Sequence, residues 1–183
     1  MITLGGLSGV SASTRTELLA APTLTTLNTL GLLDDVAVVE IDPAISDTAA
    51  TRDTFGLELN WLANCVVVGG KREGVEKIAA CVVLASTRAD VNNSLRSLLD
   101  VRKASFLPMD RAVELTGMEY GGITPIGLPV GWPIYVDSRV VDETAVIIGS
   151  GVRRSKIMLR GSVLERLPAA RVVEGLGTVI ATA

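Results

Sequence analysis

The chain has 183 residues, 48% of them hydrophobic, and a net charge of −3 at pH 7. This apolar content excludes a chain that is disordered over most of its length. The absence of histidine excludes Ser-His-Asp and Cys-His catalysis and HExxH zinc sites. Any catalysis must therefore use lysine, carboxylates, backbone groups or the substrate itself.

The two cysteines, Cys65 and Cys81, lie in apolar runs, where we expect buried, reduced thiols. The longest apolar runs are far shorter than the ~20 residues that a membrane-spanning helix needs. The first residues also lack the basic segment of a signal peptide. We therefore expect a cytoplasmic protein without membrane association, formed by a single domain over residues 1–183. The composition permits a dimer without requiring one.

The chain begins with residues 1–13, which show no periodicity and which we predict to be a loose tail. Apolar residues at helical spacing, with capping residues, predict the following helices: two between 14 and 31, broken by Pro22, then 46–56 capped by Ser46, 58–63, 91–100 capped by Asp90, 108–117 and 162–167. Alternating or continuous apolar runs predict the following strands: 35–41, 64–70, 77–86, 103–107, 133–137, a hairpin over 144–159, and 170–176.

Hairpins dominate this order, and the helices are inserted between them. Such an order argues against a doubly wound parallel sheet, in which strands alternate regularly with long helices. We predict an α+β fold in which short helices surround a mixed, largely antiparallel β-sheet or barrel.

The charges are segregated along the chain. Residues 30–60 hold seven acidic residues and one arginine, whereas residues 151–171 hold six basic residues and one glutamate. The basic stretch predicts either a solvated surface or a local face that contacts nucleic acid. In the second case Arg153 and Arg154 would contribute to it.

A glycine-rich loop, YGGITPIGL at 120–128, separates a predicted helix from a predicted strand. It belongs to an ordered set of motifs: TAAT (48–51), LANCVVV (62–68), TGMEYGGITPIG (116–127), IYVD (134–137) and VIIGSGVRRSKIML (146–159). This set resembles the YbaK/EbsC family, which also occurs as the insertion-type editing domain of bacterial prolyl-tRNA synthetases. The likeness runs from about Ile45 to Leu176, and TGMEYGGITPIG is its most specific part.

The resemblance implies a YbaK-like fold and an aminoacyl-tRNA deacylase, which cuts the ester between a wrong amino acid and the 3′-terminal adenosine of tRNA. The implied substrates are tRNAs of the proline type mischarged with alanine or cysteine. The family needs no metal or other cofactor. It relies on backbone donors, a lysine and, in some members, a hydroxyl or thiol of the substrate.

The resemblance also implies the site. Gly121 and Gly122 would present backbone N–H groups to the ester carbonyl, because glycine permits close approach. Asp137 would hold the loop or the substrate amine. The expected substrate-binding residues are Cys65, Thr124, Pro125, Gly151, Arg153 and Arg154. The alternative for the loop is a rigid turn without a ligand.

The sequence departs from the family where the lysine belongs, because Asn64 takes its place. A neutral amide is a weaker donor to a developing negative charge than an ammonium group. Three alternatives follow. Asn64 acts as a weak catalytic donor, or another cation extends into the site in place of the lysine. In the third, the protein binds its ligand without hydrolysing it. On the catalytic hypothesis, Asn64→Lys should raise hydrolysis.

Overall fold

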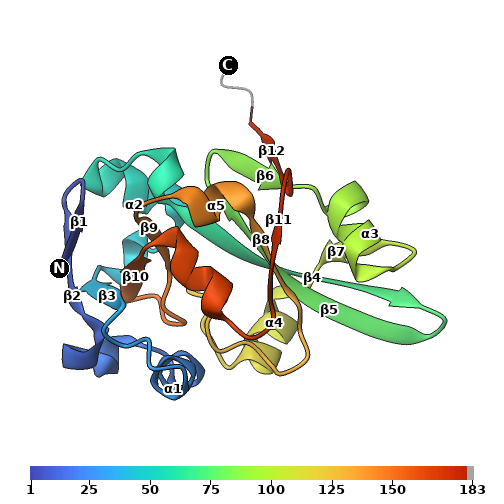
Figure 1. Cartoon of the computed structure of the whole chain (residues 1–183), viewed down its shortest axis with the longest axis horizontal. Helices are drawn as coiled ribbons and strands as arrows, with labels where there is room; N and C mark the ends of the chain where they lie inside the picture. The colour runs from blue at the N-terminus through green and yellow to red at the C-terminus, as the bar shows by residue number, and fades with distance from the viewer. Residues whose placement is uncertain (181–183) are drawn as a thin grey trace.

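The computed structural model describes residues 1–180, which form two five-stranded sheets and a short two-stranded ribbon (Figure 1). The first sheet has the order β1-β2-β3-β10-β9 and is antiparallel throughout. Its strands are β1 (Ile2–Leu4), β2 (Leu7–Ser11), β3 (Val36–Glu40), β9 (Val146–Gly149) and β10 (Ser155–Leu159).

The second sheet has the order β11-β8-β5-β4-β7, in which β8 runs parallel to both β5 and β11. Its strands are β4 (Ala63–Arg72), β5 (Val75–Leu84), β7 (Ala104–Phe106), β8 (Ile134–Asp137) and β11 (Ala170–Val173). The ribbon pairs β6 (Thr87–Ala89) with β12 (Gly177–Val179). The predicted mixed, largely antiparallel fold is confirmed.

Short helices cover the sheets. The α-helices are α1 (Ala21–Thr29), α2 (Thr48–Phe55), α3 (Arg96–Leu99), α4 (Met109–Thr116) and α5 (Ser138–Asp142). The 3₁₀ helices are η1 (Ala12–Thr14), η2 (Thr16–Leu18), η3 (Pro43–Ile45), η4 (Leu59–Trp61) and η6 (Gly161–Arg166), and η5 (Val91–Leu95) is a π-helical segment that leads into α3. Within residues 1–180, no helix has the length and apolar character needed to cross a membrane.

The main core lies between the two sheets. Val38, Ile148 and Ile157 of the first sheet belong to the same buried cluster as Val82 and Val136 of the second. Each of these five side chains is at most 1% exposed. Because successive side chains on a strand point to opposite faces, Met158 beside Ile157 belongs instead to a smaller cluster on the outer face of the first sheet. The outer face is therefore also partly covered.

The prediction of a loose tail over 1–13 is wrong, because these residues form strands β1 and β2. In β2, Leu7 and Gly9 are buried while Ser8 and Val10 are exposed. The alternation of a strand is present, but one of its inward positions is a glycine without an apolar side chain. The sequence therefore shows no alternation of apolar and polar side chains here, and the segment forms a strand by pairing with β3.

Two helix starts also differ from expectation. Asp47, not Ser46, caps α2, because its Oδ1 accepts from the backbone N–H of Ala50 at 2.9 Å. Pro22 lies in the first turn of α1 instead of breaking a helix, which is a position where a missing N–H costs nothing. The first correction leaves the side chain of Ser46 free for another role.

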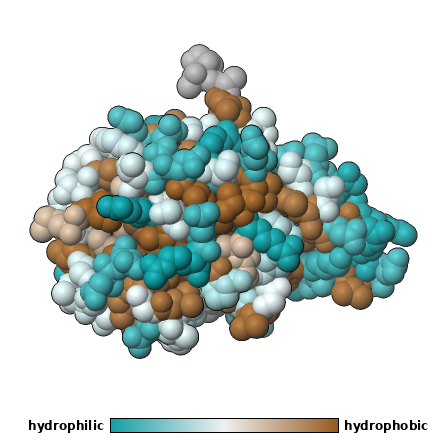
Figure 2. All heavy atoms as spheres, in the orientation of Figure 1, coloured by the Kyte–Doolittle hydropathy of each residue, from teal (hydrophilic) through white to brown (hydrophobic). Residues whose placement is uncertain are grey.

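The predicted hairpin over 64–86 is confirmed as β4 and β5, which pair over ten positions. Figure 1 shows this hairpin projecting at one end of the molecule, and Figure 2 shows hydrophilic residues gathered over that end. At the other end of β4 the two sheets meet, where Leu62 forms an isolated bridge with Ile147 of β9. A cavity lies beside this junction.

Candidate functional site

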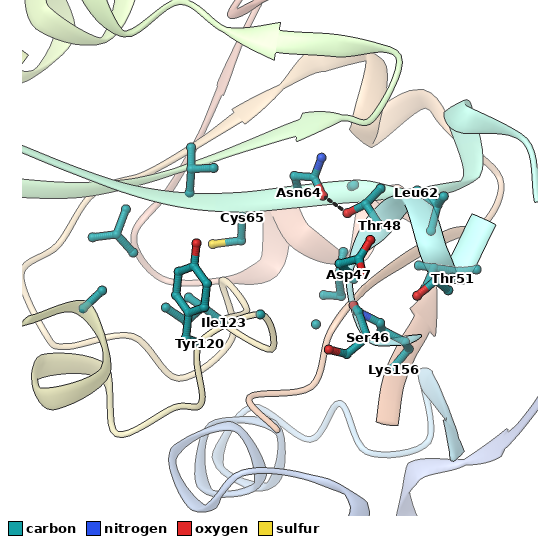
Figure 3. Close-up of a pocket in the computed structure, with 18 of the residues that line it drawn as sticks. Ser46, Asp47, Thr48, Thr51, Leu62, Asn64, Cys65, Tyr120, Ile123 and Lys156 are labelled. Carbon is teal, nitrogen blue, oxygen red and sulfur yellow. Dashed lines mark hydrogen bonds between the residues drawn. The ribbon is translucent and has the colours of Figure 1, made fainter. Parts of the chain in front are cut away.

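The cavity has a volume of about 470 Å³. Its walls are the start of β4, the start of α2, the segment from Phe106 into α4, the glycine-rich loop at 120–123, and strands β9 and β10. It therefore lies against both sheets and the loop that carries the most specific sequence motif. Its lining divides into a polar end and an apolar end (Figure 3).

The polar end gathers side chains from α2, β4 and β10. Thr48 Oγ1 donates to Asn64 Oδ1 at 2.7 Å, which fixes the amide of Asn64 against the first turn of α2 (Figure 3). Asp47 and Thr51 line the same end. Thr51 uses its hydroxyl to donate to the carbonyl of Ile45 at 2.6 Å.

Lys156 of β10 also lies at the polar end and is only 8% exposed. Its neighbour Ile157 points to the main core, so the alternation of the strand sends Lys156 to the opposite face, where it lines the cavity. Its Nζ donates to the backbone carbonyl of Ser46 at 2.5 Å. Burial lowers the pKa of this lysine from 10.5 to about 8; the negative charge of Asp47 acts to raise it and Arg153 acts to lower it. At neutral pH Lys156 is still largely an ammonium ion.

Ser46 lies between Lys156 and the glycine-rich loop. It is 1% exposed, and among the described residues its Oγ has no hydrogen-bond partner. A Cβ placed on Gly121 would lie 3.7 Å from this Oγ and 3.5 Å from Nη1 of Arg153. Gly121 itself has a φ of +83°, which glycine adopts readily. The loop thus brings its backbone close to the polar end.

The loop is held by backbone packing against the turn between β9 and β10. The N–H of Gly151 donates to the carbonyl of Gly122 at 2.7 Å, and the N–H of Gly122 donates to the carbonyl of Glu119 at 2.9 Å. A Cβ on Gly149 would lie only 2.3 Å from the carbonyl oxygen of Gly122. The N–H of Gly122 is therefore engaged in a hydrogen bond within the loop and is not free to bind a ligand. No acceptor is found for the N–H of Gly121 within residues 1–180.

The apolar end is lined by Cys65, Phe106, Met109, Tyr120 and Ile123, among others. Burial raises the pKa of the Cys65 thiol far above its usual range, with a smaller contribution from Cys81. Cys65 therefore stays a neutral, apolar side chain and is not a thiolate nucleophile. The rings of Phe106 and Tyr120 are 58% and 56% exposed, so they stand at the mouth of the cavity.

The structure brings three of the residues expected from sequence to the cavity wall: Asn64, Cys65 and Gly121. Arg153 is exposed beside Gly121, with its Nη2 donating to the carbonyl of Pro43 at 2.9 Å. The guanidinium of Arg154 instead donates to the backbone carbonyl of Glu17. Three further expected residues are buried and do not line the cavity: Thr124 and Pro125 of the glycine-rich loop, and Gly151 of the turn between β9 and β10.

Asp137 does not line the cavity. It caps α5 and is fully buried, where Arg139 Nη2 donates to it at 2.7 Å and the N–H of Gly177 donates at 2.7 Å. Burial acts to raise the pKa of Asp137, but these hydrogen bonds outweigh it and hold the pKa below its usual range. The carboxylate is therefore committed to joining β8, α5 and β12.

Sequence reasoning missed the importance of Lys156, Ser46 and Asp47. Lys156 lies within the basic stretch at 151–171, but it is the only charged residue in the run SKIML. A lone lysine in an apolar strand is the signal that could have separated it from the exposed arginines. The sequence predicts Ser46 as a helix cap, but Asp47 caps α2 instead.

The sequence model of one protein family, the aminoacyl-tRNA editing domain, matches residues 42–167. The chain belongs to this family. The matched residues include every wall of the cavity. The predicted resemblance to YbaK-type proteins is confirmed.

Particular relatives agree with this assignment. The uncharacterized protein YwhH of Bacillus subtilis (strain 168) is 27% identical over 139 residues, which cover 76% of this chain and 84% of YwhH. A crystal structure described as a proposed trans-editing enzyme for prolyl-tRNA synthetase has a TM-score of 0.70 and 22% identity, covering 85% of this chain and 94% of that one. The crystal structure of the hypothetical protein APE2540 has a TM-score of 0.73 and 19% identity, covering 86% and 99%. These two structures share the fold.

Proposed function

We propose that this protein hydrolyses the ester of mischarged aminoacyl-tRNA, acting in trans on tRNAs of the proline type that carry alanine or cysteine. The observation that carries the proposal is the two-ended cavity. Lys156, Ser46 and Asn64 offer polar groups at one end, and Cys65 and its neighbours offer a small apolar surface at the other. An aminoacyl ester has the same division between a polar reacting centre and a side chain.

The reaction consumes one water molecule. The water oxygen bonds to the carbonyl carbon, the carbonyl π pair moves to its oxygen, and the resulting intermediate expels the ribose oxygen. A proton from the water ends on that ribose oxygen, so the products are the free amino acid and the tRNA hydroxyl. Preorganised donors that face the developing oxyanion lower the barrier to such a reaction. The N–H of Gly121, for which no acceptor is found in the part of the chain that the structure describes, supports a role for the loop as one such donor.

The mouth of the cavity suits the terminal adenosine. Phe106 and Tyr120 are exposed aromatic rings at this mouth, and a nucleobase stacked on an aromatic ring gains about 1 to 3 kcal/mol. Arg153 lies near the same loop and is exposed. Arg153 and Arg154 supply positive charge for the phosphates of the acceptor stem, although the chain as a whole is acidic.

The second candidate function is a non-catalytic binder of an aminoacylated tRNA 3′ end or of a small amino-acid-like ligand. It is favoured by Asn64, a neutral residue at the place where the family resemblance implies a lysine. Such a protein binds a stable aminoacyl-adenosine analogue in the same cavity without turnover. The two candidates therefore differ in catalysis and not in the location of the ligand.

The deciding experiment mixes the purified protein with labelled mischarged tRNAs, led by alanyl- and cysteinyl-tRNA for proline, and follows amino-acid release against the uncatalysed rate. Cys65→Trp, which fills the cavity, should abolish release. Val75→Trp is the matched control, because Val75 lies on β5 and is 61% exposed. Release that survives Cys65→Trp would come from a contaminant or another site. No release by the folded wild type, with retained analogue binding, would favour the second candidate.

A further inference from the structure

Lys156 has more hydrogen-bonding capacity than the protein uses. An ammonium group has three donors, and within residues 1–180 the only acceptor found for Lys156 is the carbonyl of Ser46. No carboxylate forms a salt bridge with it among these residues. A buried charge of this kind is costly unless it is paired. A ligand that brings a negative charge would supply the missing partner.

The charged groups around Lys156 do not provide its ammonium group with a hydrogen-bonded anionic partner. Asp47 influences it only through its charge, since its Oδ1 accepts from Ala50 at the start of α2. Arg153 adds a second positive charge. On the neighbouring strands the residues in register with Lys156 are Val39 and Gly149, which carry none. The polar end of the cavity thus combines the buried ammonium group of Lys156 with the exposed carboxylate of Asp47, which forms no salt bridge with it among the described residues.

Ser46 provides an independent observation at the same place. Its hydroxyl is nearly fully buried, lines the cavity and has no partner among the described residues. A buried polar group without a partner is uncommon and destabilising in a native protein. A hydroxyl beside an ammonium ion can donate to the same anionic oxygen.

We propose that Lys156 Nζ and Ser46 Oγ together form the subsite for a single negatively charged oxygen of the ligand. On the proposed function, on which this identity rests, it is the oxygen that gains charge when water adds to the ester carbonyl. As the carbonyl π pair moves to that oxygen, Lys156 and Ser46 donate to it. The pair returns to the carbonyl when the ribose oxygen leaves with its proton. The depth of both residues favours one oxygen atom over a hydrated phosphate group.

The test uses two stable analogues of alanyl-adenosine and a binding measurement by calorimetry. One is the neutral 3′-amide, and the other is the 3′-ester of 1-aminoethylphosphonic acid, whose phosphonate carries the negative oxygen. The wild type should bind the phosphonate more tightly. Lys156→Met should weaken phosphonate binding about 10- to 100-fold while changing amide binding less than about twofold. Ser46→Ala should weaken phosphonate binding about 3- to 10-fold.

Lys71→Met is the matched control, because Lys71 is exposed on the projecting part of β4, and it should change neither affinity. Adding a 5′-phosphate to both analogues tests the other anionic group of the ligand. If Lys156→Met weakens only the 5′-phosphorylated forms, the subsite holds a phosphate and the proposal is overturned. Equal binding of amide and phosphonate by the wild type also overturns it, while leaving the proposed function standing. If neither analogue binds the folded protein, both proposals fall.

Discussion

The ammonium group of Lys156 donates to the backbone carbonyl of Ser46 at 2.5 Å, although the two residues lie 110 positions apart in the chain. This contact joins β10 to the segment before α2 and places a positive charge inside the cavity. Because no carboxylate within residues 1–180 forms a salt bridge with Lys156, we expect its charge to stabilise a bound anionic ligand and to destabilise the ligand-free protein.

Lys156→Met should therefore stabilise the protein at pH 7. Methionine has a similar length and removes the cost of burying an unpaired charge, which should raise the free energy of unfolding by about 1 to 3 kcal/mol. Urea unfolding followed by circular dichroism measures this change. Lys71→Met should leave the free energy of unfolding within about 0.5 kcal/mol of wild type. A clear loss of stability in Lys156→Met would show that Lys156 holds the fold together.

The same lysine predicts a pH dependence. Its pKa is about 8 in the fold against an ordinary 10.5, so between these values the unfolded chain binds more protons than the folded one. Stability then rises with pH, because the cost of the charge is fully present below pH 8 and is relieved toward pH 10.5. The stability difference between Lys156→Met and wild type should shrink by up to about 3 kcal/mol across this range. A difference that stays constant from pH 7 to 10 would contradict the lowered pKa.

The cavity should respond to a relocation of its positive charge. In the Lys156→Met background, Asn64→Lys should recover about tenfold of the lost phosphonate affinity, because it returns one cation to the same polar end. In the wild-type background the gain should be smaller, since two ammonium groups would repel each other. A comparable gain in both backgrounds would mean that Lys156 does not supply the charge that Asn64 lacks.

The contact between loop and turn predicts that position 149 tolerates only glycine. In Gly149→Ala the new methyl group would lie 2.3 Å from the Gly122 carbonyl oxygen, so the loop must move. We expect a loss of about 2 to 4 kcal/mol in the free energy of unfolding. Gly6→Ala is the control, because its Cβ would meet its neighbours at 3.4 Å or more. Equal effects of the two substitutions would argue against the interlocked backbone.

The exposed arginines near the loop predict a salt-dependent contact with tRNA. Reversing both Arg153 and Arg154 to glutamate should weaken tRNA binding and reduce the slope of log affinity against log salt by about 1 to 2. Reversing Arg102 and Lys103, an exposed basic pair before β7, provides the control. An unchanged slope in the Arg153 and Arg154 variant would remove these residues from the interface.

The sequence predicted the hairpin of β4 and β5 and the mixed sheet, because long apolar runs specify buried strands, but it did not predict the short strands β1, β2, β6 and β12. It also predicted that Asn64, Cys65 and Gly121 belong together, through their place in an ordered set of motifs. A lone lysine in the apolar run SKIML was the signal for Lys156, but the position of its side chain in the cavity depends on the pairing of β10 with β3 and β9. The sequence misplaced Asp137, since a carboxylate looks the same in sequence whether it meets a ligand or an arginine such as Arg139.

The cavity exists only when segments from Ser46 to Lys156 have come together across both sheets. Neither hairpin alone contains it, so a partly folded chain offers the ligand no site. A ligand present at about 100 times its dissociation constant should then stabilise the native state by about 2.7 kcal/mol. Because that gain applies only to the assembled fold, the proposed function implies that the supply of mischarged tRNA would influence how long each copy of the protein survives proteolysis.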